Sequence, residues 1–122
     1  MIKHAVASET SAKETVLSLV KALNNEDFDT ARTYADDSMT FEGVLGSRNG
    51  ADAYFEDMRH MKMKYHIIKV LADSTDVCLF YNLDMSGVNI FGCGWYHVQD
   101  GKITSLKVIF DPRPVLEAKN KK

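Results

Sequence analysis

A β-hairpin is predicted by the segment Trp95-Tyr96-His97-Val98-Gln99-Asp100-Gly101-Lys102-Ile103-Thr104-Ser105-Leu106. Apolar and polar residues alternate on both sides of Asp100-Gly101, which is typical of strands with one buried face. Asp-Gly is the pair that best supplies the positive φ angles of a two-residue hairpin. The sequence therefore predicts an antiparallel hairpin formed by residues 90–99 and 102–111.

Outward from this hairpin, the same period of two occupies residues 64–73 and 76–86. The C-terminal half is therefore predicted to be an antiparallel sheet. Pro112 and Pro114 follow directly and should end the last strand, because proline cannot donate to a strand ladder.

The N-terminal half carries helical patterns instead. Ser11-Ala12-Lys13-Glu14 is a capping box before an apolar stripe, which predicts a helix over residues 11–24. Asp27 can cap a short second helix, a short strand is expected at residues 38–42, and residues 43–50 form a turn-rich loop. A third helix is expected over residues 51–61. Helices followed by a strand meander predict one α+β domain at residues 10–114, with loose termini at 1–9 and 115–122.

Composition and charge exclude several classes of protein. The chain has 122 residues, 15 Lys plus Arg against 17 Asp plus Glu, and no basic stripe, so nucleic acid is not an expected partner. It lacks the roughly 20 apolar residues of a membrane span and the apolar stretch of a signal peptide, so no membrane association and a cytoplasmic location are expected. The spacing of Cys78 and Cys93, and of His4, His60 and His66, predicts no redox pair, no metal and no cofactor.

Glu42 is the main candidate for chemistry. It lies at the end of the apolar strand Ser38-Met39-Thr40-Phe41-Glu42-Gly43, over which the later strands can fold. A carboxylate held in such a place resists ionisation and becomes a usable proton acceptor near neutral pH. The alternative is a strand-end carboxylate that points to solvent or pairs with Arg48.

Two segments carry a family resemblance. Residues 35–43 resemble the helix-to-strand segment of ketosteroid isomerases and their SnoaL-like relatives, within the nuclear-transport-factor-2-like superfamily. Residues 101–110 are similar to the last strand of these isomerases, and Phe110-Asp111-Pro112 to the ending common in SnoaL-like proteins. The resemblance implies a cystatin-like cone, with three N-terminal helices in the concave face of a curved, mainly antiparallel sheet. It also implies a small-molecule pocket and a frequent homodimer.

The resemblance assigns expected roles to individual residues. Glu42 matches the carboxylate that shuttles a proton, whereas Leu19 and Gly94 stand where the isomerases keep their two oxyanion donors. Because losing a preorganised donor costs about 100- to 1000-fold in rate, an efficient ketosteroid isomerase is not expected. Tyr81 or Tyr96 could replace a donor, or both could be ordinary sheet aromatics with their hydroxyls at the rim.

Further residues follow from the same alignment. Asp111 is a secondary candidate acid at the mouth of the cavity. The residues expected to line an apolar cavity are Leu19, Tyr34, Phe55, Met58, Leu79, Leu83, Gly94, Leu106 and Phe110.

The outer face of the predicted sheet would carry Phe80, Trp95, His97 and Ile109, which is too apolar for a face left in water and predicts a homodimer. Two functions remain open at this point. One is a small-molecule-binding protein with an apolar pocket. The other is an enzyme in which Glu42 acts as general base for isomerisation, cyclisation or dehydration of a small apolar carbonyl compound.

Overall fold

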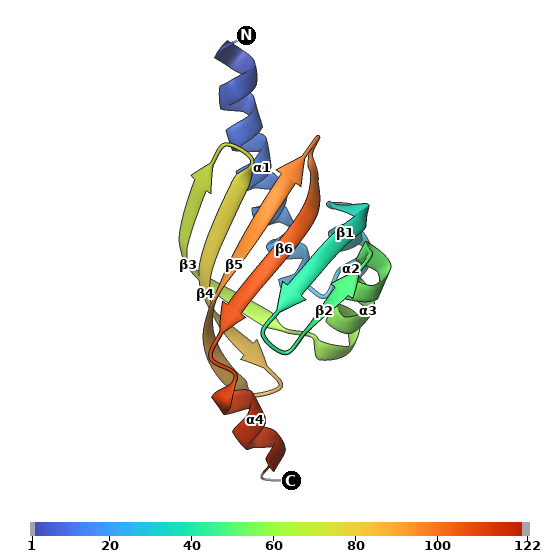
Figure 1. Cartoon of the computed structure of the whole chain (residues 1–122), viewed down its shortest axis with the longest axis vertical. Helices are drawn as coiled ribbons and strands as arrows, with labels where there is room; N and C mark the ends of the chain where they lie inside the picture. The colour runs from blue at the N-terminus through green and yellow to red at the C-terminus, as the bar shows by residue number, and fades with distance from the viewer. Residues whose placement is uncertain (1, 121–122) are drawn as a thin grey trace.

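The computed structural model describes the backbone of residues 2–120 and the side chains of residues 12–118. Over these residues, two helices precede the first strand, a third helix lies between the second and third strands, and a fourth helix follows the last strand (Figure 1). The elements are α1 (Ile2–Asn24), α2 (Phe28–Arg32), β1 (Ala35–Gly43), β2 (Gly46–Asn49), α3 (Ala51–Met61), β3 (Lys64–Asp73), β4 (Asp76–Met85), β5 (Val88–Gln99), β6 (Lys102–Phe110) and α4 (Arg113–Asn120).

The strands form one six-stranded sheet in the order β2-β1-β6-β5-β4-β3. All neighbouring strands are antiparallel except β1 and β6, which are parallel. Helix α1 crosses one face of the curved sheet, and α2 and α3 lie beside the β1–β2 end (Figure 1). This is the predicted α+β cone with its mainly antiparallel sheet.

The hairpin that anchored the prediction is confirmed. Asp100 and Gly101 have φ angles of 51° and 76°, and Gln99 pairs with Lys102 across the turn. The strands β3 to β6 lie within two residues of their predicted bounds, α3 matches its range, and β6 ends at Phe110, before the two prolines.

Three elements differ from the expectation. Residues 43–50 were expected to be a loop, but Gly46–Asn49 pair with β1 as β2, because the turn at Val44-Leu45 folds the chain back on itself. Helix α1 begins at Ile2 and not at Ser11, since neither Pro nor Gly interrupts residues 2–10. The loose ends expected at 1–9 and 115–122 are therefore helical where the structure describes them, with residues 115–120 belonging to α4.

The core lies between the concave face of the sheet and the apolar stripe of α1. Val16, Leu19, Val20 and Leu23 of this stripe are at most 2% exposed. Alternate residues of β4 meet them from the sheet, and the register of β4 with β5 and of β5 with β6 keeps inward positions aligned. The predicted inward phase of these strands is confirmed, as the alternating burial shows.

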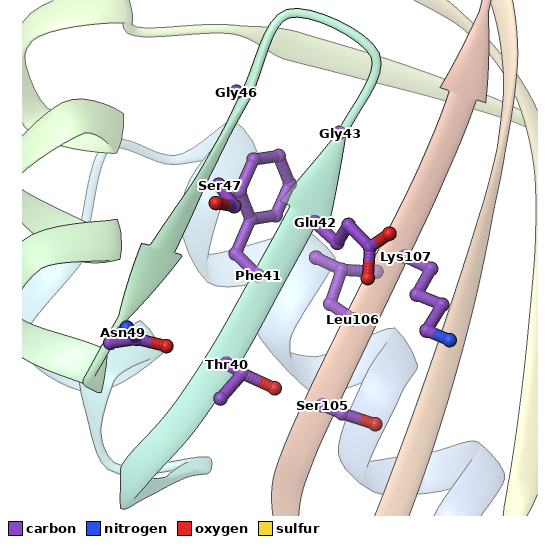
Figure 2. A pocket seen from close by; sticks show the side chains of 10 residues that line it. All are labelled: Thr40, Phe41, Glu42, Gly43, Gly46, Ser47, Asn49, Ser105, Leu106 and Lys107. Atoms are coloured by element: carbon purple, nitrogen blue, oxygen red, sulfur yellow. The ribbon is translucent and has the colours of Figure 1, made fainter.

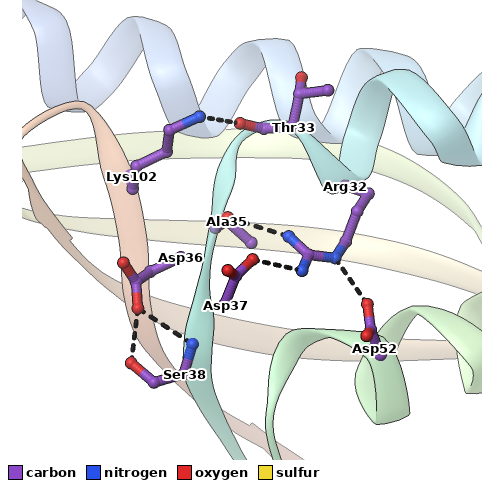
Figure 3. A network of polar contacts seen from close by, with 8 residues as sticks. All are labelled: Arg32, Thr33, Ala35, Asp36, Asp37, Ser38, Asp52 and Lys102. Atoms are coloured by element: carbon purple, nitrogen blue, oxygen red, sulfur yellow. Dashed lines mark hydrogen bonds and ion pairs between the residues drawn. The ribbon is translucent and has the colours of Figure 1, made fainter.

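Polar contacts fix where the helices meet the sheet. Arg32 at the end of α2 donates to Asp37 of β1, to Asp52 of α3 and to the carbonyl oxygen of Ala35 (Figure 3). Asn24, at the end of α1, donates to the carbonyl oxygen of Tyr65 and accepts from its backbone N–H, at 2.9 and 2.7 Å. A side chain amide thus takes the place of a neighbouring strand at the start of β3.

None of the helices within residues 2–120 has the length and apolar character needed to cross a membrane.

Candidate functional site

Glu42 does not face the interior of the cone. Its side chain is exposed on the outer face of β1, and in the parallel register with β6 it lies opposite Lys107. The inward position is taken by Phe41, whose ring packs 5.2 Å from that of Tyr54, and strand alternation then turns the next residue outward. The prediction of a carboxylate facing the cavity is wrong for this reason. The alternative, a strand-end carboxylate that points to solvent, is confirmed, but its proposed pair with Arg48 does not form, because Arg48 binds Asp57 at 2.8 Å.

Asp111 is also unsuited to acid–base work. It accepts two hydrogen bonds from Arg113 Nε at 3.0 Å and one from Arg113 Nη2 at 2.6 Å. These hydrogen bonds from Arg113 hold the pKa of the carboxyl below its usual value. Asp111 is therefore an ionised, paired residue at the start of α4.

The interior is a packed core and not an open apolar cavity. Of the residues expected to line the cavity, Leu19, Phe55, Met58, Leu79, Leu83 and Leu106 are at most 4% exposed, Gly94 is buried, and Tyr34 and Phe110 pack against them from the edge. The two grooves found on the described residues lie elsewhere. One crosses β2, β1 and β6, and the other runs between β5, β6 and Pro114.

The space expected to be empty is filled by aromatic side chains that carry hydroxyl groups. Tyr81 and Tyr96 point inward as predicted and are 2% and 1% exposed, so they are not rim residues. Tyr54 of α3 and Tyr65 of β3 join them. Tyr65 packs edge-on against Tyr81 with ring centroids 5.1 Å apart, and its hydroxyl donates to Met58 Sδ at 4.0 Å. We call Tyr54, Tyr65, Tyr81 and Tyr96 the tyrosine cluster.

Burial keeps the tyrosine cluster protonated. Loss of water around the hydroxyl raises the pKa of Tyr65 to about 12, and raises the pKa values of Tyr54, Tyr81 and Tyr96 further. The nearby phenols add to the increase for Tyr54, Tyr81 and Tyr96. At neutral pH the cluster can donate hydrogen bonds, but it holds no base that could remove a proton from carbon.

Two glycines make room for the ring of Tyr81. A Cβ atom at Gly92 would lie 3.3 Å from Tyr81 Cε1, and one at Gly94 would lie 3.2 Å from the Tyr81 hydroxyl and 3.0 Å from Tyr96 Cε1. Both glycines are buried on the inward face of β5. The Tyr81 ring therefore packs directly on the backbone of β5 at these two glycines.

The hydroxyls of Tyr81 and Tyr96 border a small space. Neither makes a hydrogen bond to a protein group within residues 12–118. Yet no polar side-chain atom in that part of the chain is both unpartnered and sealed from water. The two hydroxyls must therefore touch space that a water molecule can reach.

Tyr81 and Tyr96 were predicted from the sequence as candidate donors, whereas Tyr54 and Tyr65 were not. Tyr54 belonged to the apolar face assigned to the third helix, and Tyr65 shares the inward phase of Ile67 and Val70. The sequence did not indicate that Tyr54, from a helix that packs against β1 and β2, and Tyr65, from β3, join the same core as Tyr81 and Tyr96. The positions of the missing oxyanion donors, Leu19 and Gly94, do lie in the interior, as expected.

The outer face carries the apolar residues expected there. Trp95 and Ile109 are 48% and 70% exposed, and Phe80 is half-buried. Asp76 accepts hydrogen bonds from Trp95 Nε1 at 2.9 Å and pairs with His97 Nδ1 at 3.0 Å, a contact that the sequence did not indicate. Within the described residues, no group of three or more His, Cys, Asp or Glu side chains is arranged to hold a metal.

Comparison with known structures agrees with this architecture. An NTF2-like protein of unknown function from Cytophaga hutchinsonii is 42% identical, with a TM-score of 0.85 over 86% of this chain and 94% of that one. An LEH-like epoxide hydrolase of M. tuberculosis is 26% identical, with a TM-score of 0.80 over 93% of this chain and 92% of the other. A putative ketosteroid isomerase from Kribbella flavida shares the fold at 13% identity, with a TM-score of 0.79 over 85% and 80%.

No curated protein matches the chain in sequence. The model of the SnoaL-like domain, in contrast, matches residues 16–106, which span α1 to β6. With its curved sheet, its helices on the concave face and this match over most of its length, the chain belongs to the SnoaL-like family of the NTF2-like superfamily.

Proposed function

We propose that this protein binds a small, mostly apolar molecule that carries a hydrogen-bond acceptor such as a carbonyl oxygen, and that it does not catalyse proton transfer. The observation that carries the proposal is the tyrosine cluster, a set of neutral hydroxyls at the centre of an apolar core. A buried donor without a protein partner favours a ligand that supplies an acceptor.

The alternative enzyme requires a base beside the ligand. Glu42, the expected base, lies on the other side of the sheet, and Asp111 is bound to Arg113. Among the described residues, the buried set contains no charged side chain at all. A ketone held by Tyr81 and Tyr96 would be polarised, but no buried side chain among residues 12–118 is a carboxylate that could accept its α-proton.

Entry of the ligand requires the ring of Tyr81 to move away from Gly92 and Gly94. Rotation of this side chain would uncover Gly92 and Gly94 and leave a space bounded by Tyr96, Leu106 and Phe110. Because only one aromatic ring moves, the surrounding strands can keep their register. The ligand would then occupy the volume that Tyr81 fills in the free protein.

The test is a titration with cyclohexanone, followed by the backbone amide signals of a uniformly labelled protein. We expect saturable shifts at residues 92–96 and 81, and weaker binding of methylenecyclohexane, which has the same shape without the oxygen. Tyr96→Phe should weaken the binding of cyclohexanone by about threefold to tenfold, which is the contribution of one hydrogen bond.

Tyr34→Phe is the matched control, since Tyr34 lies between α2 and β1 and outside the tyrosine cluster. Equal affinity for the two probes, or equal loss in both variants, would contradict the proposal.

We further propose that the protein assembles as a homodimer through the outer sheet face. Phe80, Phe91, Trp95, His97 and Ile109 lie on this face; Phe91 is 58% exposed and Ile109 70%. A contiguous apolar patch on a soluble protein is typical of an interface, and a twofold dimer would cover the same patch on both copies. Ile109→Lys should give a monomer in light scattering, whereas Leu45→Lys, which changes an equally apolar exposed residue on the β1–β2 turn, should leave the dimer intact.

A further inference from the structure

We propose that the groove across β2, β1 and β6 is a second binding site, built for a small neutral molecule with several hydroxyl groups, such as a monosaccharide. The groove has a volume of about 530 Å³ and lies on the outer face of the sheet, away from the tyrosine cluster. Its polar side chains are Thr40, Glu42, Ser47, Asn49, Ser105 and Lys107.

Strand register arranges these side chains as a regular array. Glu42 of β1 lies opposite Ser47 of β2 on one side and opposite Lys107 of β6 on the other. Thr40 of β1 likewise lies between Asn49 and Ser105. Directly opposed residues share a face of the sheet, so the six form two rows of three on one surface (Figure 2).

The dimensions of this polar array follow from sheet geometry. Neighbouring strands lie about 4.8 Å apart, and residues two apart on a strand lie about 6.8 Å apart. Three strands and two rows therefore span an area of about 10 by 7 Å, which matches one sugar ring with its hydroxyls.

The array has hydrogen-bonding capacity that the protein does not use. Within residues 12–118, none of its six side chains makes a hydrogen bond or an ion pair with another residue. Glu42 and Lys107 are opposite each other, but they form no salt bridge of 4.0 Å or less. The ammonium of Lys107 lies instead 5.5 Å from the centre of the Trp95 ring.

The chemistry of the array selects the ligand class. It combines one carboxylate, one ammonium, one amide and three hydroxyls, so its net charge is zero. A ligand with a single charge would meet one favourable and one unfavourable charge. Vicinal hydroxyl groups, in contrast, can donate to Glu42 and Asn49 and accept from Lys107 and the hydroxyls of Thr40 and Ser105.

The site lies beside the proposed dimer patch and not within it. The patch residues are on β4, β5 and β6, whereas the array reaches the edge strand β2. Two array residues border the patch: Lys107 lies opposite Trp95 and contacts its ring, and Ser105 lies opposite His97. The remaining four array residues are on β1 and β2, away from the patch.

The experiment is a titration of the full chain with D-glucose, D-galactose and D-mannose, followed by backbone amide shifts. We expect at least one sugar to give saturable shifts confined to residues 40–49 and 105–107. Glu42→Gln, which keeps the shape of the side chain, should weaken the binding of that sugar by about tenfold or more, because it removes charge-assisted hydrogen bonds. Thr40→Val should also weaken the binding of that sugar. Asn82→Ala, an exposed polar residue on the same sheet face but outside the array, is the control and should bind normally.

Absence of saturable shifts with all three sugars would overturn the proposal. So would saturable binding that is unchanged in both Glu42→Gln and Thr40→Val. Glycine serves as a zwitterionic probe in the same assay: saturation of the array by glycine without binding of any sugar would show that the ligand class is wrong.

Discussion

Raising the pH to 11 should destabilise this protein strongly, because the tyrosine cluster resists ionisation only in the folded state. In the unfolded chain a tyrosine ionises near pH 10, whereas in the folded state burial raises the pKa of Tyr65 to about 12 and also raises the pKa values of Tyr54, Tyr81 and Tyr96 well above their usual range. The unfolded state therefore loses protons first. Stability is fully present below pH 10 and falls as the pH rises towards the folded pKa values.

The size of the effect can be worked out from these pKa values. One pH unit above the unfolded pKa, each phenol that stays protonated in the folded state costs about 1.4 kcal/mol. Four such phenols together lower the free energy of unfolding by about 5.6 kcal/mol, which is comparable to the whole stability of a small domain. Cys78 and Cys93 act in the same direction, since burial raises the pKa of both thiols.

The assay is urea unfolding at pH 8 and at pH 11, with tyrosinate absorbance recorded in parallel. Tyr96→Phe isolates the contribution of one phenol, because phenylalanine cannot ionise and the thiols are unchanged. Its loss of stability between the two pH values should be smaller than that of the wild type by about 1.4 kcal/mol. If all five tyrosines ionise in one step near pH 10 while the circular dichroism stays native, the reasoning is refuted.

Two substitutions test the packing that surrounds the site. Gly94→Val should destabilise the protein by about 1 to 3 kcal/mol in urea unfolding, because the new side chain would overlap two tyrosine rings, whereas Gly46→Ala, which enters open space, should change little. Asn24→Ala should cost about 1 to 3 kcal/mol, since it leaves the backbone N–H and C=O of Tyr65 without partners, and the exposed neighbour substitution Asn25→Ala should be nearly neutral. An unstable Gly46→Ala, or equal losses in the two asparagine variants, would contradict these contacts.

Local sequence rules were sufficient for most of the fold. The Asp100-Gly101 turn fixed the register of β5 and β6 at the hairpin, and alternation gave the inward phase of residues such as Val77, Leu79 and Tyr96. The register shift after His97, which places Ile103 and Leu106 both inward, was not predicted. The α3 helix followed from its apolar face. These features depend on neighbours in the chain, which is why they could be predicted.

The candidate site depended on contacts between distant segments. Glu42 was expected inside, but its orientation is decided by Phe41, which packs on Tyr54 of α3. The tyrosine cluster likewise requires β3 to bring Tyr65 against Tyr81. An alignment by family can assign a residue to a strand, but a shift of one position reverses the face on which it lies.

Hydrogen exchange at the α-carbons of cyclohexanone, followed by proton NMR in deuterium oxide, tests most directly whether this protein binds without proton transfer. We expect the protein to bind the ketone while its α-protons exchange no faster than in buffer, because the buried side chains described for residues 12–118 include neutral phenols but no charged group. Faster exchange that is abolished by Glu42→Gln would contradict this conclusion and restore the carboxylate to a catalytic role.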